Sequence, residues 1–159
     1  MNYFICGFSG AGKSYLLKQI ELEHKFQNYH FIDLDFLIDQ KYATEFDSLG
    51  SMIEKIGMDA FRMMEFNEIK DLASKTNIIL ALGAGALNPK TQELLKSWTG
   101  LWLATDFDTC FERIKNDSNR PLVKLGKDKL KELYNERLSI YQQYQTVSNL
   151  NQVLEITKS

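Results

Sequence analysis

The sequence predicts an α/β fold in which parallel strands alternate with helices, and three observations lead to this prediction. The apolar run 3–6 is followed by a glycine-rich loop and then by residues 14–20, whose apolar side chains recur at helical spacing. Further apolar runs at 30–33, 77–82 and 101–104 are separated by segments of helical pattern. The run 77–82 carries no charge, as expected of a central parallel strand that is buried on both faces.

The remaining elements follow from the same periodicities. Residues 48–75 predict two helices broken near Gly57, because glycine interrupts an otherwise helical pattern there. The other expected elements are helices at 36–41, 106–115 and 127–145, and a last strand at 151–156.

Composition favours one globular domain over residues 1–159. The chain is 44% apolar and 25% charged, enough to build a core, and no apolar run is long enough to cross a membrane. A net charge of −2 argues against a nucleic-acid-binding surface, which usually has a basic excess. The N-terminus lacks the layout of a signal peptide. Cys6 and Cys110 give no disulfide framework, so we expect a reduced, cytoplasmic protein in which neither cysteine is catalytic.

Residues 7–14, Gly-Phe-Ser-Gly-Ala-Gly-Lys-Ser, fit the pattern G-x-x-x-x-G-K-[ST] of a P-loop. The glycines let backbone N–H groups turn inward on a phosphate, and the helix N-terminus adds its positive end. Lys13 is expected to reach the outer phosphates, and the Ser14 hydroxyl to bind Mg²⁺. An ordinary glycine-rich turn is the alternative, but the flanking strand and helix favour a nucleotide-binding protein.

Two carboxylates, Asp33 and Asp35, follow the predicted strand 30–33 at its carboxyl end, where open parallel sheets bind ligands. They are candidates for metal binding and general-base work, although Asp35 alone also suits the cap of the next helix. The strand 77–82 lacks the Asp that commonly supplies a Mg²⁺ ligand, which makes Asp33 the best candidate for that role. The small-residue segment 83–86 then either allows close backbone approach to a ligand or forms only a tight turn.

Arginine is rare in this chain and therefore informative. Only Arg62, Arg113, Arg120 and Arg137 occur among 19 basic residues, so all four are candidates for carboxylate or phosphate recognition. Arg62 also stands three residues before Glu65, which is the spacing of a plain surface ion pair on a helix. The polar segment 117–127 contains Arg120 and one of only two prolines, and it is typical of a mobile lid that closes over phosphates.

The order of these features resembles shikimate kinase, a small enzyme with the P-loop fold of the nucleoside-monophosphate-kinase type. The resemblance rests on the N-terminal P-loop, Asp33-Leu34-Asp35, the Phe-Arg-x-x-Glu of residues 61–65, the turn after strand 77–82 and the Arg-Pro-Leu of residues 120–122. It covers nearly the whole chain. It implies three layers with a five-stranded parallel sheet of order 2-3-1-4-5, a lid at about 117–127 and shikimate-binding helices at about 35–75. The implied reaction transfers the γ-phosphate of ATP, with Mg²⁺, to the 3-hydroxyl of shikimate in the chorismate route, by a monomer.

The resemblance also implies roles for individual residues. The catalytic residues are Lys13, Asp35 and Arg120, and the metal ligands are Ser14 and Asp33. The nucleotide-binding residues are Gly10, Ala11, Gly12, Lys13, Ser14, Tyr15, Arg113 and Arg120. The shikimate-binding residues are Asp35, Arg62, Gly83, Ala84, Gly85 and Arg137, with Phe61 and Glu65 as neighbours of Arg62.

Three departures from the family pattern raise further expectations. Ala84 replaces the middle glycine of the turn, so its methyl is expected to tighten or reshape the substrate pocket, and Met58 replaces a usual Glu. The chain ends at about the adenine-packing loop, which implies that the terminal helix is missing and adenine binding is altered. Two alternatives remain beside shikimate phosphorylation: a related kinase for another polyhydroxy acid such as gluconate, and a nucleotide-binding homologue without catalysis.

Overall fold

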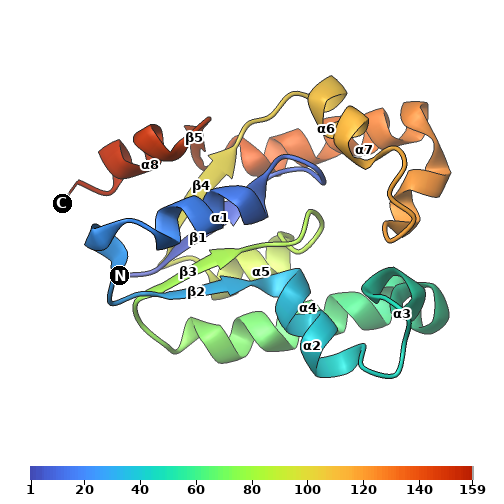
Figure 1. Ribbon diagram of the computed structural model, residues 1–159, viewed down its shortest axis with the longest axis horizontal. Helices are drawn as coiled ribbons and strands as arrows, with labels where there is room; N and C mark the ends of the chain where they lie inside the picture. Colours follow the sequence, from blue (N-terminus) through green and yellow to red (C-terminus); the bar gives the residue numbers. More distant parts are fainter. Residues whose placement is uncertain (159) are drawn as a thin grey trace.

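A five-stranded, all-parallel sheet forms the centre of the computed structural model, which describes residues 1–158 (Figure 1). The strands are β1 (Tyr3–Cys6), β2 (His30–Asp33), β3 (Ile78–Ala81), β4 (Thr99–Leu103) and β5 (Gln145–Val147). Their spatial order is β2-β3-β1-β4-β5, which confirms the predicted order. All four residues of β1 and all four of β3 are buried, because parallel strands at the centre of such a sheet are covered on both faces.

Helices cover both faces of the sheet and complete three layers. They are α1 (Lys13–Glu21), α2 (Leu34–Tyr42), α3 (Leu49–Ile56), α4 (Met58–Ala73), α5 (Pro89–Leu94), α6 (Phe107–Ile114), α7 (Lys127–Tyr141) and α8 (Leu150–Ile156), with 3₁₀ helices η1 (His24–Phe26) and η2 (Pro121–Leu125). Helix α1 packs on β1, β2 and β3 and contacts α8, while α4 contacts α5. In Figure 1, α1 lies in front of the sheet and α5 behind it.

Short polar side chains begin most of the helices that follow strands and loops. Ser48, Asn88, Asp106 and Asn149 each accept a hydrogen bond from a backbone N–H of the first turn of α3, α5, α6 and α8 respectively. The cap of α2 is Asp33, whose side chain accepts from the backbone N–H of Phe36. The alternative in which Asp35 serves only as this cap is therefore excluded, and Asp35 lies in the first turn of α2 without that role.

The C-terminal stretch differs from the sequence-based expectation. Residues 151–156 belong to helix α8, so the predicted strand there is wrong, and the last strand is the three-residue β5. Helix α7 ends at Tyr141 instead of continuing to residue 145. The expected absence of a terminal helix is also wrong, because α8 follows β5 and contacts α1. The apolar side chains of 150–156 recur at helical spacing and Asn149 caps them, which is a helix signal.

The core lies between the sheet and its helices and includes both cysteines as free, buried thiols. Among residues 1–158, no helix combines the length and the hydropathy that crossing a membrane requires.

Candidate active site

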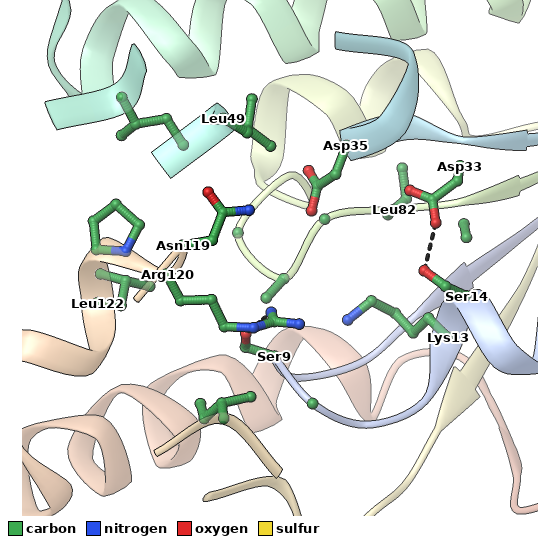
Figure 2. Close-up of a pocket in the computed structure, with 18 of the residues that line it drawn as sticks. Ser9, Lys13, Ser14, Asp33, Asp35, Leu49, Leu82, Asn119, Arg120 and Leu122 are labelled. Carbon is green, nitrogen blue, oxygen red and sulfur yellow. Dashed lines mark hydrogen bonds between the residues drawn. The ribbon is translucent and has the colours of Figure 1, made fainter. Parts of the chain in front are cut away.

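A cavity of about 350 Å³ opens at the carboxyl ends of β1, β2 and β3 (Figure 2). Its walls come from the P-loop, from the ends of β2 and β3, from α3 and α4, and from the segment 117–127. Parallel strands deliver their following loops to one edge of the sheet, which is why segments far apart in the sequence meet here.

The P-loop has the backbone that its glycines predict. Gly10 and Gly12 have φ angles of +83° and +100°, a region that side-chain-bearing residues rarely adopt. A Cβ on Gly10 would also lie 2.7 Å from the Cys110 carbonyl oxygen, so the loop fits closely against α6. The Lys13 ammonium donates to the carbonyl oxygens of Gly7 (2.7 Å) and Phe8 (2.9 Å). Burial lowers the pKa of Lys13 to about 8, while the nearby Asp35 carboxylate opposes that shift.

Two arginines lie on the P-loop side of the cavity. The Arg113 guanidinium, on α6, donates to the carbonyl oxygens of Gly10 (3.0 Å) and Ala11 (3.3 Å). Arg120 pairs with Asp117 at 2.9 Å and donates to the Ser9 hydroxyl, so its guanidinium reaches from the lid segment toward the loop (Figure 2). Tyr15 also lines the cavity and is 69% exposed.

The Ser14 hydroxyl and the Asp33 carboxylate contact each other, as the dashed line in Figure 2 marks. Both are oxygen donors of the kind that Mg²⁺ prefers. No group of three or more His, Cys, Asp or Glu side chains that could hold a metal ion is present within residues 1–158. Proteins commonly bind Mg²⁺ with only one or two carboxylates, and phosphate and water supply the other ligands.

Asp35 lies across the cavity from Lys13 (Figure 2). Its carboxylate packs directly on Gly83, where a Cβ would stand 2.7 Å from Oδ1. Burial raises the pKa of Asp35, and the charge of Lys13 opposes the rise. The Asp33 carboxylate acts in the same direction as burial. The two carboxylates thus occupy different environments: Asp33 contacts Ser14, and Asp35 faces the cavity.

Arg62 and Glu65 form an ion pair on α4, but it is not the plain surface pair that their spacing allows. The Glu65 side chain is 1% exposed and that of Arg62 is 26% exposed. Only one Glu65 oxygen is bound by Arg62, and Oε2 is buried without a hydrogen-bond partner in the described chain. Burial raises the pKa of Glu65 to about 7, although the charge of Arg62 opposes the shift.

Arg137 reaches this same corner from α7. A Cβ on Gly85 would lie 2.0 Å from Nη2 of Arg62 and 2.8 Å from Nη2 of Arg137, so both guanidinium groups meet over that glycine. Nη1 of Arg137 is buried and has no hydrogen-bond partner within residues 1–158. Gly85 lines the cavity, whereas Arg137 does not. Two adjacent guanidinium groups, one of them with an unused buried donor, are chemically suited to bind an anion.

The lid segment 117–127 contacts the opposite wall of the cavity. The Gly50 N–H of α3 donates to the Asn119 side-chain oxygen at 2.8 Å, and a Cβ on Gly50 would lie 2.5 Å from the Asn119 carbonyl oxygen. Lys124 of the lid also pairs with Glu54. The lid therefore bridges α3 and, through Arg120, the P-loop.

The structure brings nearly all of the candidate residues together around one cavity. Sequence reasoning did not single out Ser9 and Asn119, which line the cavity, or Thr105 and Tyr141, which contact the segments around it. Tyr141 had a signal, because it follows Arg137 by four residues and so lies on the same helix face. Thr105 accepts from Tyr134 and donates to the Ala11 carbonyl oxygen at 2.7 Å, a contact that no local pattern signals.

Comparison with known proteins agrees with this geometry. The family model for shikimate kinase matches residues 9–155. The shikimate kinase of Sulfurihydrogenibium sp. is 32% identical over 142 residues, covering 88% of this chain and 82% of that protein. The bifunctional shikimate kinase/3-dehydroquinate synthase of Thermotoga maritima is 31% identical over 155 residues, which are 96% of this chain and only 30% of that protein.

A solved structure of shikimate kinase from Acinetobacter baumannii, in complex with shikimate, superposes with a TM-score of 0.85. It is 25% identical, and the match covers 99% of this chain and 90% of that one. The match to the family model spans most of the sequence, and the sheet order and helix arrangement agree with it. The chain belongs to the shikimate kinase family.

Proposed function

We propose that this chain transfers the γ-phosphoryl group of ATP to the 3-hydroxyl of shikimate, giving shikimate 3-phosphate and ADP, in the route to aromatic amino acids. The observation that carries the proposal is the meeting of Arg62 and Arg137 over Gly85, in the corner of a cavity whose other wall is a P-loop. A small acid with ring hydroxyls needs a site of this kind, because two guanidinium groups bind its carboxylate while its hydroxyls face the phosphate donor.

Asp35 is the residue assigned to the reacting hydroxyl. It lines the cavity beside Gly83 and faces Lys13. It orients the hydroxyl by accepting its hydrogen bond, and its raised pKa suits it to receive the proton as the oxygen bonds to phosphorus and the bond to ADP breaks. The acid is assigned to the part of the cavity wall that is formed by Gly83, Ala84 and Gly85.

The phosphate groups are assigned to the P-loop and the arginines. The backbone N–H groups of residues 10–15 surround the phosphates, and Lys13 and Arg120 stabilise the charge that develops on the transferred group. To do so, Lys13 exchanges its bonds to the Gly7 and Phe8 carbonyls for phosphate oxygens. Arg113 lies where the loop meets α6 and is assigned to the adenine side.

Ser14 and Asp33 are the residues that would hold Mg²⁺, which supplies positive charge beside the phosphates when bound. Their contact places a hydroxyl and a carboxylate at the start of α1, and both are oxygen donors that suit this ion.

The proposal extends to the organisation of the chain. Residues 1–159 act as one P-loop kinase domain with a mobile lid at about 117–127 and shikimate-binding helices at about 35–75. The chain works as a cytoplasmic monomer without nucleic-acid or membrane partners. A net charge of −2 and two free cysteines are consistent with these assignments.

The test is a coupled ADP-release assay with ATP and Mg²⁺, run with shikimate, with gluconate and without acceptor. We expect release that depends on shikimate. Arg62→Ala should lower kcat/KM for shikimate by about 100-fold or more, since truncating one partner of a buried charge pair costs about 2–5 kcal/mol. Lys96→Ala, which removes an exposed ion pair with Glu93, is the matched control and should change nothing.

Other outcomes assign the protein differently. Preference for gluconate would make it a kinase of another polyhydroxy acid and would give the Ala84 methyl a role in specificity. ATP binding without phosphoryl transfer to any acid would make it a nucleotide-binding homologue without catalysis.

A further inference from the structure

Helix α7 carries three side chains on one face: Tyr134, Arg137 and Tyr141, spaced by three and then four residues. Tyr141 is 2% exposed, and its hydroxyl donates to the Ala84 carbonyl oxygen at 2.7 Å. Ala84 is the middle residue of the 83–85 turn that forms part of the cavity wall. Tyr141 itself is not among the residues that line the cavity, so it supports the turn from behind.

The hydrogen bond from Tyr141 orients the whole peptide group between Ala84 and Gly85, and not only the Ala84 carbonyl. The peptide between Ala84 and Gly85 is planar and trans, so holding its C=O toward Tyr141 turns the Gly85 N–H the opposite way. The one backbone hydrogen bond described within the turn runs from the Ala86 N–H to the Gly83 carbonyl oxygen, so it does not hold the Ala84–Gly85 peptide. The Tyr141 hydroxyl is therefore the hydrogen-bond donor that holds this peptide next to the two arginines.

Tyr141 also faces Arg137, one helical turn earlier on α7. Burial raises the pKa of Tyr141, so its hydroxyl stays protonated and remains a donor, and the charge of Arg137 opposes the rise. Arg137 makes a cation–π contact with the Phe8 ring at 5.7 Å, while its buried Nη1 has no partner within residues 1–158. One phenol thus touches the turn and borders a guanidinium that has a buried, unpaired donor among residues 1–158.

We propose that Tyr141 is a positioning residue for the acid substrate, which holds the 83–85 turn and borders Arg137 so that both are in place before the acid binds. This inference rests on the proposed function for the identity of the acid, but the contact with the turn does not depend on it.

Helix α7 also contains a matched control, Tyr134, which lies on the nucleotide side of the site. The Tyr134 hydroxyl donates to the Thr105 carbonyl oxygen at 3.1 Å, and Thr105 in turn donates to Ala11 of the P-loop. The Tyr134 ring also packs edge-on against Phe8 at 5.2 Å. Tyr134 therefore supports the nucleotide loop in the way that Tyr141 supports the acid turn.

The experiment compares Tyr141→Phe with Tyr134→Phe, each of which removes one hydroxyl and keeps the ring. We expect Tyr141→Phe to raise KM for shikimate by about tenfold while KM for ATP stays within about twofold, because a hydrogen bond lost on one substrate's side acts on that substrate. Tyr134→Phe should instead raise KM for ATP by about tenfold while KM for shikimate stays within about twofold. Thermal melting of both variants verifies that each remains folded.

A second readout follows the turn without any substrate. Amide hydrogen exchange of a peptide spanning residues 83–87 should speed up in Tyr141→Phe and not in Tyr134→Phe. Unchanged exchange in Tyr141→Phe, or an equal rise of both KM values, overturns the role of Tyr141. Absence of shikimate-dependent ADP release by the wild type overturns the proposed function instead, so the two failures are distinguishable.

Discussion

The cavity has a nucleotide half around the P-loop and an acid half around Arg62 and Arg137. The two halves differ in whether their charged side chains have hydrogen-bond partners in the protein. In the nucleotide half, Lys13, Arg113 and Arg120 all hold protein oxygens: backbone carbonyls for the first two, and Asp117 and Ser9 for the third. In the acid half, Arg137 Nη1 and Glu65 Oε2 are buried without partners within the described chain.

This difference bears on what binding costs each half. A phosphate must displace bonds that Lys13 and Arg120 already make, and it requires those side chains to rearrange. In the site proposed above, a carboxylate between Arg62 and Arg137 would gain a buried donor that has no partner within residues 1–158, and unpaired buried polar groups are costly. We infer that the acid half is preorganised and that the nucleotide half is remodelled on binding.

The largest effect on KM for shikimate is expected at Gly85, where an added methyl group would meet both arginines. In Gly85→Ala the new methyl would lie 2.0 Å from Nη2 of Arg62 and 2.8 Å from Nη2 of Arg137, so both guanidinium groups must move. KM for shikimate should rise by about 100-fold, as expected of a shift of about 1 Å in a binding group, while the Kd of ATP measured by calorimetry stays within about twofold.

Lys96→Ala, which removes an exposed ion pair with Glu93, is the control and should leave KM for shikimate unchanged. An unaltered KM for shikimate in Gly85→Ala would show that the arginine pair does not hold the acid.

A smaller effect is expected in the pH dependence of acid binding, which involves Glu65 of the acid half. Burial raises the pKa of Glu65 to about 7, and a bound carboxylate adds a second negative group beside Arg62, which raises that pKa further. Acid binding therefore favours protonated Glu65: affinity is full below about pH 7 and falls as the pH rises through that value. The loss should reach about tenfold for each pKa unit between the free and bound states.

Calorimetric titration with shikimate from pH 5.5 to 8.5 tests this prediction, with Glu65→Gln expected to flatten the profile. Glu68→Gln is the control on the same helix, because the partners Lys41 and Tyr42 lower the pKa of Glu68 and it cannot titrate near neutrality. A profile of Glu65→Gln that still falls through pH 7 would assign the titration to another group.

The smallest effect concerns the lid, which bridges the halves. Gly50→Ala places a methyl 2.5 Å from the Asn119 carbonyl oxygen and should push the lid away from α3. Because the lid also carries Arg120, kcat/KM for both substrates should fall together by about fivefold, equivalent to about 1 kcal/mol.

Lys124→Ala removes the exposed lid ion pair with Glu54 and should stay within about twofold of the wild type. A fall confined to one substrate in Gly50→Ala would mean that the lid serves only one half.

The sequence by itself was sufficient for the elements whose signals are local. The P-loop is a contiguous motif between a strand and a helix, and the uncharged run 77–82 predicts a central strand, so both were predicted correctly. The C-terminal region was predicted wrongly, because the three residues of β5 are too short to show a periodicity. The helical spacing of 150–156 and its Asn149 cap were misinterpreted as a strand.

The charges of the site were decided only by the tertiary structure. Arg62 and Glu65 have the spacing of a surface pair in sequence, but packing of α4 against the turn after β3 buries Glu65 and half-buries Arg62. The meeting of Arg137 with Gly85 and the bond from Tyr141 to Ala84 join segments that are distant in the chain. Burial changes the pKa and the hydrogen-bonding needs of a side chain without changing its identity, and it depends on which segments the parallel sheet brings to one edge. The sequence therefore determined which groups are available, and the fold determined which of them are buried together and left unpaired for a ligand.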